Sequence, residues 1–264
     1  MKLSICDKTK KDLFVALFQT IKNFSSIVCI IFKEDHLYIQ GMDKSHVCLY
    51  DVKIFKQWFQ CYEYNSEEPN NICVDSYTFH TIISKTHEAQ CITLHYHGLF
   101  YDVFNIDLEC KQANNSVKGD FNKYFKIPLI DFDNQLVNIP DADYDAEFIM
   151  NSKKICEITT QMLLFGSDIV FKCDEEKINL IANGTNGEML VNIPIEDLTE
   201  YSIVEGGEIN LLYSLNYIYK MCLTNKLSNE IVFYISEEYP MKIQYDLGDE
   251  SYMIFFIAPK ISND

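Results

Sequence analysis

A weak internal repeat constrains this chain more than any other feature of its 264 residues. Residues 27–39 read as a strand, an acidic turn and a second strand, and residues 169–180 read the same way. Each segment is preceded by a helical pattern and followed by a further helix and strand, at an offset of about 140 residues. The repeat predicts two copies of one α+β unit, in which two amphipathic helices cover one face of an antiparallel sheet.

Four helices are expected, two in each copy. The second and fourth are expected over residues 76–85 and 211–222. Ser152 is a candidate N-cap for the third helix, and Gly166 is a candidate for its end. The apolar positions at helical spacing are Leu13, Phe14, Leu17, Ile21 and Phe24 in the first helix, and Ile155, Ile158, Met162 and Phe165 in the third.

The segment between the two copies fits neither the helix period nor the strand period. It contains Pro128 and Pro140 among many Asp and Asn residues, with a few scattered apolar residues. An extended linker is the expected structure. The expected organisation is therefore an N-terminal domain over residues 1–127, an interdomain connector over 128–145 and a C-terminal domain over 146–264.

Composition limits the classes of function. All 22 basic residues are lysine, the formal net charge is −17, and the ten cysteines form no CxxC pair. With no secretory leader and no apolar run near the ~20 residues that span a bilayer, a reducing, soluble compartment is expected. The acidic total does not exclude a nucleic-acid partner, because at physiological salt electrostatic fields decay over ~8 Å and a local lysine stripe can still face phosphate.

Four short motifs carry a resemblance to a known family. Residues 39–49 read IQGMDKSHVCL, residues 129–133 LIDFD, residues 138–144 NIPDADY and residues 258–261 APKI. In this order and spacing they closely resemble the proliferating cell nuclear antigen (PCNA) family of DNA sliding clamps, over the whole chain. The segment from Asn114 to Asn122 departs from the family's usual length.

The resemblance implies an α+β clamp fold whose two similar domains assemble into a ring around duplex DNA. The clamp would act as a polymerase processivity factor in DNA replication and repair, with a clamp loader as partner and with no catalysis, cofactor or metal. It implies the nucleus as location, or a cytoplasmic viral replication site for a viral protein. A homotrimer is expected, and a heteromeric ring or a stable monomer stays open. The strands expected at the subunit interface contain Tyr124, Phe125, Ile127, Met189, Leu190 and Val191.

Lysines on the expected helices are the candidates for DNA contact. Lys8, Lys11 and Lys22 are spaced so that they share one stripe of the first helix. In the family, the third helix usually has arginines where this chain has Glu157 and Thr160, so looser contact with DNA is expected. The full set of DNA-binding candidates is Lys8, Lys11, Lys22, Lys85, Lys153, Lys154, Lys220 and Lys226.

A docking groove for client peptides is also implied by the resemblance. The expected client presents an aliphatic anchor and two aromatic residues on one helical turn to a shallow apolar pocket beneath the connector. Taken singly, Met42, Val47, Phe256 and Ile261 are more typical of a protein core than of a docking site. The expected groove residues are Met42, His46, Val47, Val137, Ile139, Pro240, Phe256, Ala258, Pro259 and Ile261.

Alternatives from other classes rest on weaker patterns. A clamp-fold subunit of a heteromeric checkpoint or transcription complex is the nearest, and a metal-dependent hydrolase is the alternative from another class. His95-x-His97 places two imidazoles on one strand face but lacks matching Cys or carboxylate spacing for zinc. Residues 141–145 read DADYD but lack the glycine and glutamate of a calcium loop. The glycines at 184–187 and 206–207 are typical of turns rather than of phosphate-binding loops.

Overall fold

The computed structural model describes the chain except for residues 68, 98–101, 111–120, 224–225 and 261–264. The chain divides into two compact units. The first unit consists of Met1–Met42, Asp51–Leu136 and Leu247–Tyr252, and the second consists of Asp43–Tyr50, Val137–Asp246 and Met253–Asp264. Each unit therefore contains a short segment from the other half of the sequence.

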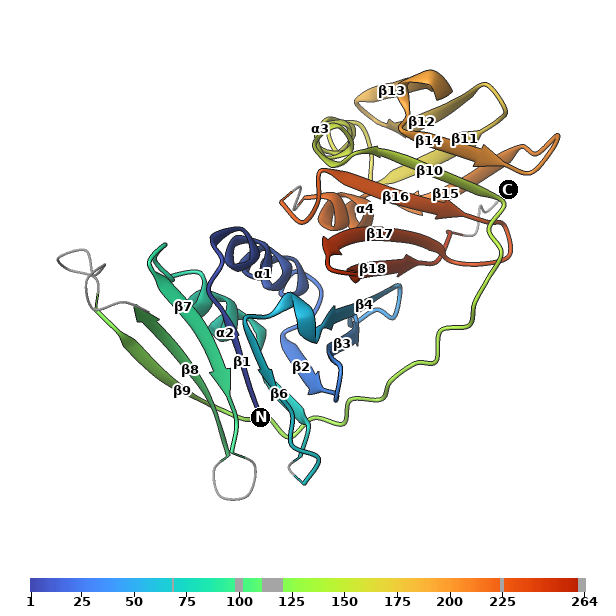
Figure 1. Cartoon of the computed structure of the whole chain (residues 1–264). Helices are drawn as coiled ribbons and strands as arrows, with labels where there is room; N and C mark the ends of the chain where they lie inside the picture. The colour runs from blue at the N-terminus through green and yellow to red at the C-terminus, as the bar shows by residue number, and fades with distance from the viewer. Residues whose placement is uncertain (68, 98–101, 111–120, 224–225, 261–264) are drawn as a thin grey trace. The chain divides into compact units, whose positions relative to one another are not determined.

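The first unit contains two helices that pack against each other, α1 (Lys8–Ile21) and α2 (Ser76–Ile83), and two runs of hydrogen-bonded strands (Figure 1). One run has the order β5-β1-β7-β8-β9, and the other has the order β4-β3-β2-β6. The strands are β1 (Lys2–Ile5), β2 (Ile27–Phe32), β3 (His36–Met42), β4 (Cys48–Phe55), β5 (Cys61–Glu63), β6 (Asn71–Asp75), β7 (Gln90–His95), β8 (Val103–Cys110) and β9 (Lys123–Pro128), with a short 3₁₀ helix η1 (Lys56–Trp58).

The second unit repeats this arrangement. Helices α3 (Ser152–Met162) and α4 (Leu215–Cys222) pack together, and the strand orders are β14-β10-β16-β17-β18 and β13-β12-β11-β15. The strands are β10 (Ala146–Asn151), β11 (Asp168–Cys173), β12 (Lys177–Gly184), β13 (Gly187–Pro194), β14 (Glu200–Ile203), β15 (Ile209–Ser214), β16 (Glu230–Ile235), β17 (Met241–Gly248) and β18 (Ser251–Ile257), with η2 (Ile195–Asp197).

The two units share one topology. Adding nine to each strand number of the first unit's orders gives the second unit's orders without exception. The helices hold equivalent places, since α1 and α3 follow β1 and β10, whereas α2 and α4 follow β6 and β15. The α+β fold class and the duplication expected from the sequence are confirmed.

Polar side chains at the helix starts explain where the helices begin. Asp7 and Asp75 accept hydrogen bonds from the backbone amides of Lys10 and Thr78, at 2.9 and 2.7 Å. The third helix is capped by Asn151, which accepts from the amides of Lys153 and Lys154, and not by Ser152 as the sequence suggested.

Three further expectations for the helices are wrong in their boundaries. The fourth helix begins at Leu215 and not at Leu211, because Ile209–Ser214 pairs antiparallel with β11 and this pairing overrides the local helical pattern. The second helix ends at Ile83, so Lys85 lies just beyond it. Gly166 does not end the third helix, which stops at Met162 with Leu163 as C-cap.

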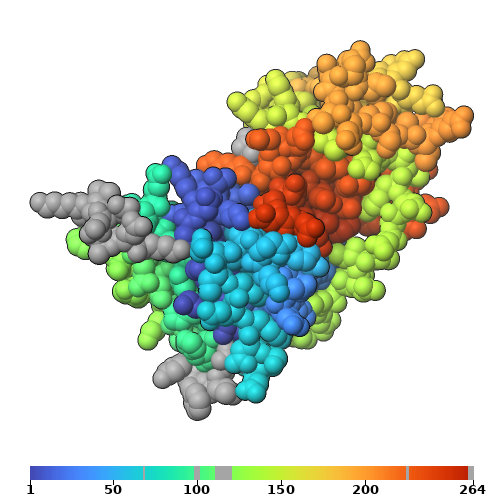
Figure 2. Space-filling model, viewed as in Figure 1, coloured from blue at the N-terminus to red at the C-terminus, as the bar shows by residue number. Residues whose placement is uncertain are grey.

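Residues 129–144 form no helix or strand, and most of them are exposed. This segment, yellow-green in the space-filling view, lies on the surface (Figure 2). Its first residues are anchored in the first unit, where the amide of Ile130 donates to the carbonyl of Cys73 at 2.8 Å. An interdomain connector over residues 128–145 stays a prediction, with which the lack of helix and strand in residues 129–144 is consistent.

Cysteine pairing differs from the expectation of a wholly reduced protein. Cys29 and Cys73 lie directly opposite each other on β2 and β6 and form a disulfide. Eight further cysteines among the described residues form no disulfide, and four of these are buried. No helix in the described part of the chain is both long and apolar enough to cross a membrane.

The core of the second unit contains one buried hydroxyl with no hydrogen-bond partner among the described residues, that of Tyr213. Burying an unsatisfied polar group costs about 1–3 kcal/mol. We therefore expect Tyr213→Phe to raise the free energy of unfolding by about 1 kcal/mol in urea denaturation. The matched control is Tyr245→Phe, which removes a buried hydroxyl that donates to the carbonyl of Met221 at 3.0 Å and should lower stability. A Tyr213→Phe protein less stable than the unmodified chain would contradict the assignment.

Candidate nucleic-acid interface and docking surface

Most of the candidate lysines lie exposed at or near the helices. Lys153 and Lys154 occupy the first turn of α3, and Lys220 occupies the last turn of α4. Lys22 is half-buried, and Lys11 is buried. The exposed candidates are Lys8, Lys85, Lys153, Lys154, Lys220 and Lys226.

Lys22 and Lys8 already have partners in the first unit. The Lys22 ammonium lies 3.0 Å from Nδ1 of His80 and 5.8 Å from the centre of the exposed Tyr77 ring. Burial, followed by the nearby Lys22 charge, lowers the pKa of His80, which favours a neutral imidazole that accepts from the ammonium. Lys8 forms a surface ion pair with Glu88 at 3.0 Å. Each lysine can bind a DNA phosphate only if the phosphate joins or replaces its present partner.

Lys11 does not belong to the exposed stripe that helical spacing suggested. Its side chain is buried, and its ammonium donates hydrogen bonds to the carbonyls of His87, Glu88 and Gln90 in the turn before β7. An ammonium with three carbonyl acceptors is fully satisfied inside the fold. The expectation that Lys11 contacts DNA is therefore wrong, and its role is to hold this turn against α1.

We expect Lys11→Met to lower the free energy of unfolding by about 2 kcal/mol, because it leaves the buried carbonyl of Gln90 and two partly buried carbonyls without this donor. Methionine retains most of the aliphatic part of the lysine side chain, so the change in stability reports the loss of the ammonium group. Lys8→Met on the same helix is the control, and it should change stability by less than about 1 kcal/mol because an exposed ion pair contributes little. Equal effects of the two substitutions in urea denaturation would refute the assignment.

The loop between β3 and β4 is organised around one carboxylate. Asp43 is 7% exposed and accepts hydrogen bonds from the backbone amides of Ser45, Val47 and Cys48, at 2.7–2.8 Å. Its Oδ2 also accepts from the Tyr217 hydroxyl of α4 at 2.6 Å. Burial raises the pKa of Asp43, but these hydrogen bonds outweigh it, so the pKa lies below its usual value and the carboxylate stays ionised.

This loop presents a polar tip. His46 adopts a left-handed backbone conformation with φ of 57°, which is uncommon for a residue other than glycine. The side chains of Lys44, Ser45 and His46 are exposed, and Val47 is half-buried. The carbonyl of Val47 accepts from the amide of Ala258 at 3.4 Å, so the segment after β18 lies beside the loop within the second unit.

The expected docking residues are at least partly exposed wherever the structure describes them. Val137 is 47% exposed, and none of the described members is fully buried. Met42, Val47 and Phe256 are each half-buried, so their burial fits the core interpretation as well as the docking one. Ile261 lies outside the described residues, and Met42 belongs to the first unit, whereas the second unit contains His46, Val47, Val137, Ile139, Pro240, Phe256, Ala258 and Pro259.

The two segments expected at the subunit interface are edge strands. β9 is the last strand of the run β5-β1-β7-β8-β9, and β13 is the first of β13-β12-β11-β15. Tyr124 on β9 is 63% exposed, and Leu190 on β13 is 57% exposed, whereas Ile127 is buried in its own unit. Phe125, Met189 and Val191 are half-buried. Unpaired edges with exposed apolar side chains are competent for pairing with another chain.

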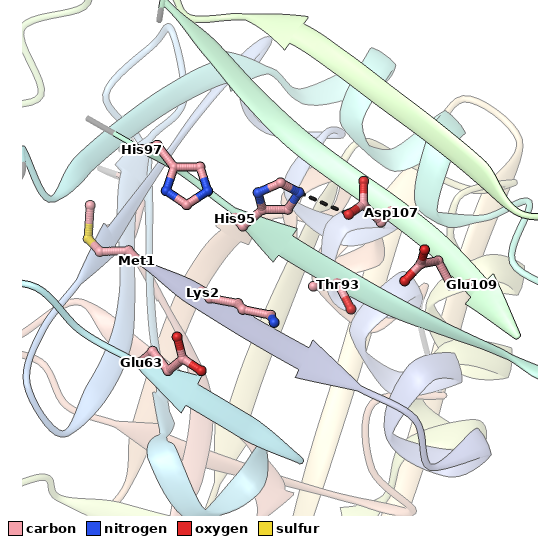
Figure 3. A pocket seen from close by; sticks show the side chains of 8 residues that line it. All are labelled: Met1, Lys2, Glu63, Thr93, His95, His97, Asp107 and Glu109. Carbon is pink, nitrogen blue, oxygen red and sulfur yellow. Dashed lines mark hydrogen bonds and ion pairs between the residues drawn. The ribbon is translucent and has the colours of Figure 1, made fainter. Parts of the chain in front are cut away.

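A hollow on the first unit tests the metal alternative. Its lining includes His95 and His97 on one side and Asp107 and Glu109 on the next strand, with Lys2 and Glu63 opposite (Figure 3). Nε2 of His95 lies 2.9 Å from Oδ2 of Asp107, so the imidazole is hydrogen-bonded to this carboxylate. Among the described residues, no group of three or more His, Cys, Asp or Glu side chains is placed to hold a metal ion.

Comparison of the chain with known proteins identifies its protein family. The family model described as "Proliferating cell nuclear antigen, N-terminal domain" matches residues 8–135, and the model described as "Proliferating cell nuclear antigen, C-terminal domain" matches residues 138–260. The duplicated fold is thus that of the DNA sliding clamps, which act as processivity factors and not as enzymes. The chain belongs to the proliferating cell nuclear antigen family.

Curated relatives come from fungi, protists and viruses. The chain is 26% identical to a proliferating cell nuclear antigen of Chaetomium thermophilum over 231 residues, which cover 86% of each chain. It is 25% identical to proliferating cell nuclear antigen 2 of Plasmodium falciparum over 258 residues, covering 95% of this chain and 96% of the relative. It is 24% identical to a probable DNA polymerase sliding clamp of Autographa californica nuclear polyhedrosis virus, covering 86% of this chain and 84% of the relative.

Proposed function

We propose that the chain assembles into a closed ring that encircles duplex DNA and tethers a DNA polymerase to its template. The single observation that carries this proposal is the match of both clamp domains to one chain whose two units share one topology. The nucleus, or a viral replication site for a viral protein, is the proposed location, as relatives of both kinds exist.

The duplication supports a route to ring closure. In the strand order, β18 is the hydrogen-bonded neighbour of β4. By the shared topology, β9 is the counterpart of β18, and β13 is the counterpart of β4. A β9–β13 pairing between copies would therefore repeat a junction that the chain already makes, and head-to-tail repetition of one junction closes a ring. A homotrimer with six similar units is the proposed assembly.

Exposed lysines near the helices support contact with the DNA backbone. A lysine ammonium binds phosphate as a point charge and imposes no register, which suits a protein that slides. The helix-associated lysines act locally despite the net charge of −17, because charges more than ~8 Å apart are largely screened at physiological salt. Weak and salt-sensitive binding to linear DNA is the expected result.

The surface between the 43–48 loop, residues 137–139 and the segment after β18 is the proposed docking groove for client peptides. Clients would insert an aliphatic anchor and two aromatic side chains from one helical turn. A clamp loader is a further proposed partner, because a closed ring must open to admit DNA.

The double substitution Val137→Ala and Ile139→Ala should weaken client binding about tenfold or more, since each removes apolar surface that a ligand would cover. Calorimetry with a synthetic peptide that presents an aliphatic anchor and two aromatic residues on one turn measures the effect. Leu136→Ala, which truncates a neighbouring exposed side chain outside the proposed groove, is the control. Unchanged affinity of the double variant would count against the groove.

Retention on DNA of different topology tests the proposed function as a whole. The protein, loaded with its loader onto a nicked circular plasmid, should stay bound in high salt and be lost once the plasmid is cut. Equal loss from circular and linear DNA would contradict encirclement.

A further inference from the structure

A hydrogen bond joins helix α4 to the loop between β3 and β4. Tyr217 is half-buried, and its hydroxyl donates to Oδ2 of Asp43 at 2.6 Å across 174 residues of sequence. The Lys220 ammonium lies 5.7 Å from the centre of the Tyr217 ring, one turn further along the helix. Both Tyr217 and Asp43 belong to the second unit.

The acceptor of this hydrogen bond controls the conformation of the 43–48 loop. The same Oδ2 atom accepts from the amide of Ser45, and Oδ1 accepts from the amides of Val47 and Cys48. The amide of His46 donates to the Asp43 carbonyl at 3.0 Å, which closes the turn around a left-handed residue. Most of the loop's internal hydrogen bonds therefore converge on one side chain.

The Asp43 carboxylate can accept all of these hydrogen bonds only if it is held in one orientation. The amides of Ser45 and Val47 belong to the loop itself and move with it, and the amide of Cys48 stands at the point where the loop joins β4. The Tyr217 hydroxyl is different, because it comes from a helix whose neighbouring residues Ile218 and Met221 are fully buried. A rigid donor of this kind fixes the orientation of a flexible acceptor.

We propose that Tyr217 is a positioning residue for client docking: its hydroxyl orients Asp43, and Asp43 holds the 43–48 loop in the conformation that presents Lys44, Ser45, His46 and Val47 to a bound peptide. This inference rests on the docking groove proposed above. It assigns to α4 a task besides carrying Lys220, which is a candidate for DNA contact.

The test uses Tyr217→Phe in the full chain, because this substitution keeps the aromatic side chain and removes only the hydroxyl. Affinity for the synthetic peptide with an aliphatic anchor and two aromatic residues should fall about tenfold in calorimetry, because a hydrogen bond to a charged group contributes on that scale. Hydrogen exchange of the Ser45, Val47 and Cys48 amides should become at least several-fold faster. The matched control is Tyr219→Phe, because Tyr219 is a half-buried tyrosine on the same helix that makes no hydrogen bond to the loop among the described residues.

The outcomes separate a positioning role from a purely structural one. Faster exchange confined to residues 45–48, with weaker peptide binding and an unchanged urea midpoint, supports the proposal. Faster exchange throughout the second unit, or peptide affinity equal to that of the unmodified chain, overturns it. If the unmodified chain does not bind the peptide, the proposed groove fails separately, and unchanged protection of the three amides in Tyr217→Phe then overturns the positioning of the loop as well.

Discussion

Replacing Lys85, Lys153 and Lys220 together by glutamate should abolish stimulation of the polymerase on long templates. Each change reverses a charge on an exposed side chain at or just beyond a helix end, so three attractive contacts with phosphate become repulsive. Each lost phosphate contact lowers the salt slope of DNA binding by about 0.9. A primer-extension assay at two salt concentrations measures both effects. Lys11 is left unchanged, because its buried ammonium serves the fold.

A control with the same total charge separates location from net charge. Lys2, Lys56 and Lys172 are exposed and lie on β1, η1 and β11, outside the four helices. Their conversion to glutamate should leave stimulation within about twofold, since distant surface charges are screened. If both triple variants behave alike, the assignment of a DNA-facing helix surface fails.

Leu190→Glu should convert the assembly to single chains and thereby remove processivity. Leu190 lies on the edge strand β13 and is 57% exposed in one chain, so the substitution should leave the folded unit itself stable. Placing a charge where β9 of a neighbouring copy would pair costs several kcal/mol at a desolvated interface. Analytical ultracentrifugation measures the change in mass.

The matched control for this change is Val204→Glu. Val204 is 50% exposed and follows β14, so it belongs to neither of the two proposed interface strands. This variant should assemble like the unmodified chain. Assembly of Leu190→Glu at normal strength would show that β13 does not form the junction.

The local order of apolar and polar residues in the sequence was sufficient to predict the strand pairs that are repeated in the two units. The strand, acidic turn and strand of each half correspond to β2 with β3 and to β11 with β12. Apolar residues alternate along β11 and β12, and β2 is a short, wholly apolar run, which are both patterns that predict strands. Where prediction failed, long-range contacts decided. Pairing with β11 drew Ile209–Ser214 into a strand, although its apolar spacing also suits a helix.

For the candidate site, too, local sequence singled out some residues, and long-range contacts decided the others. Helical spacing placed Lys8, Lys11 and Lys22 on one stripe, but spacing does not reveal that three carbonyls before β7 would take up the Lys11 ammonium. The link between Tyr217 and Asp43 joins residues 174 positions apart, and neither residue has a local pattern that points to the other. By contrast, the motif containing Asp43, His46 and Val47 was sufficient to single out the loop for which client docking is proposed.

The mass of the unmodified protein in solution, measured by light scattering after size exclusion at micromolar concentration, tests the central claim most directly. The account predicts a single species near three times the 30.8 kDa of one chain, because β9 and β13 of successive copies complete one another. A species that stays at 30.8 kDa under these conditions would contradict a self-assembled ring.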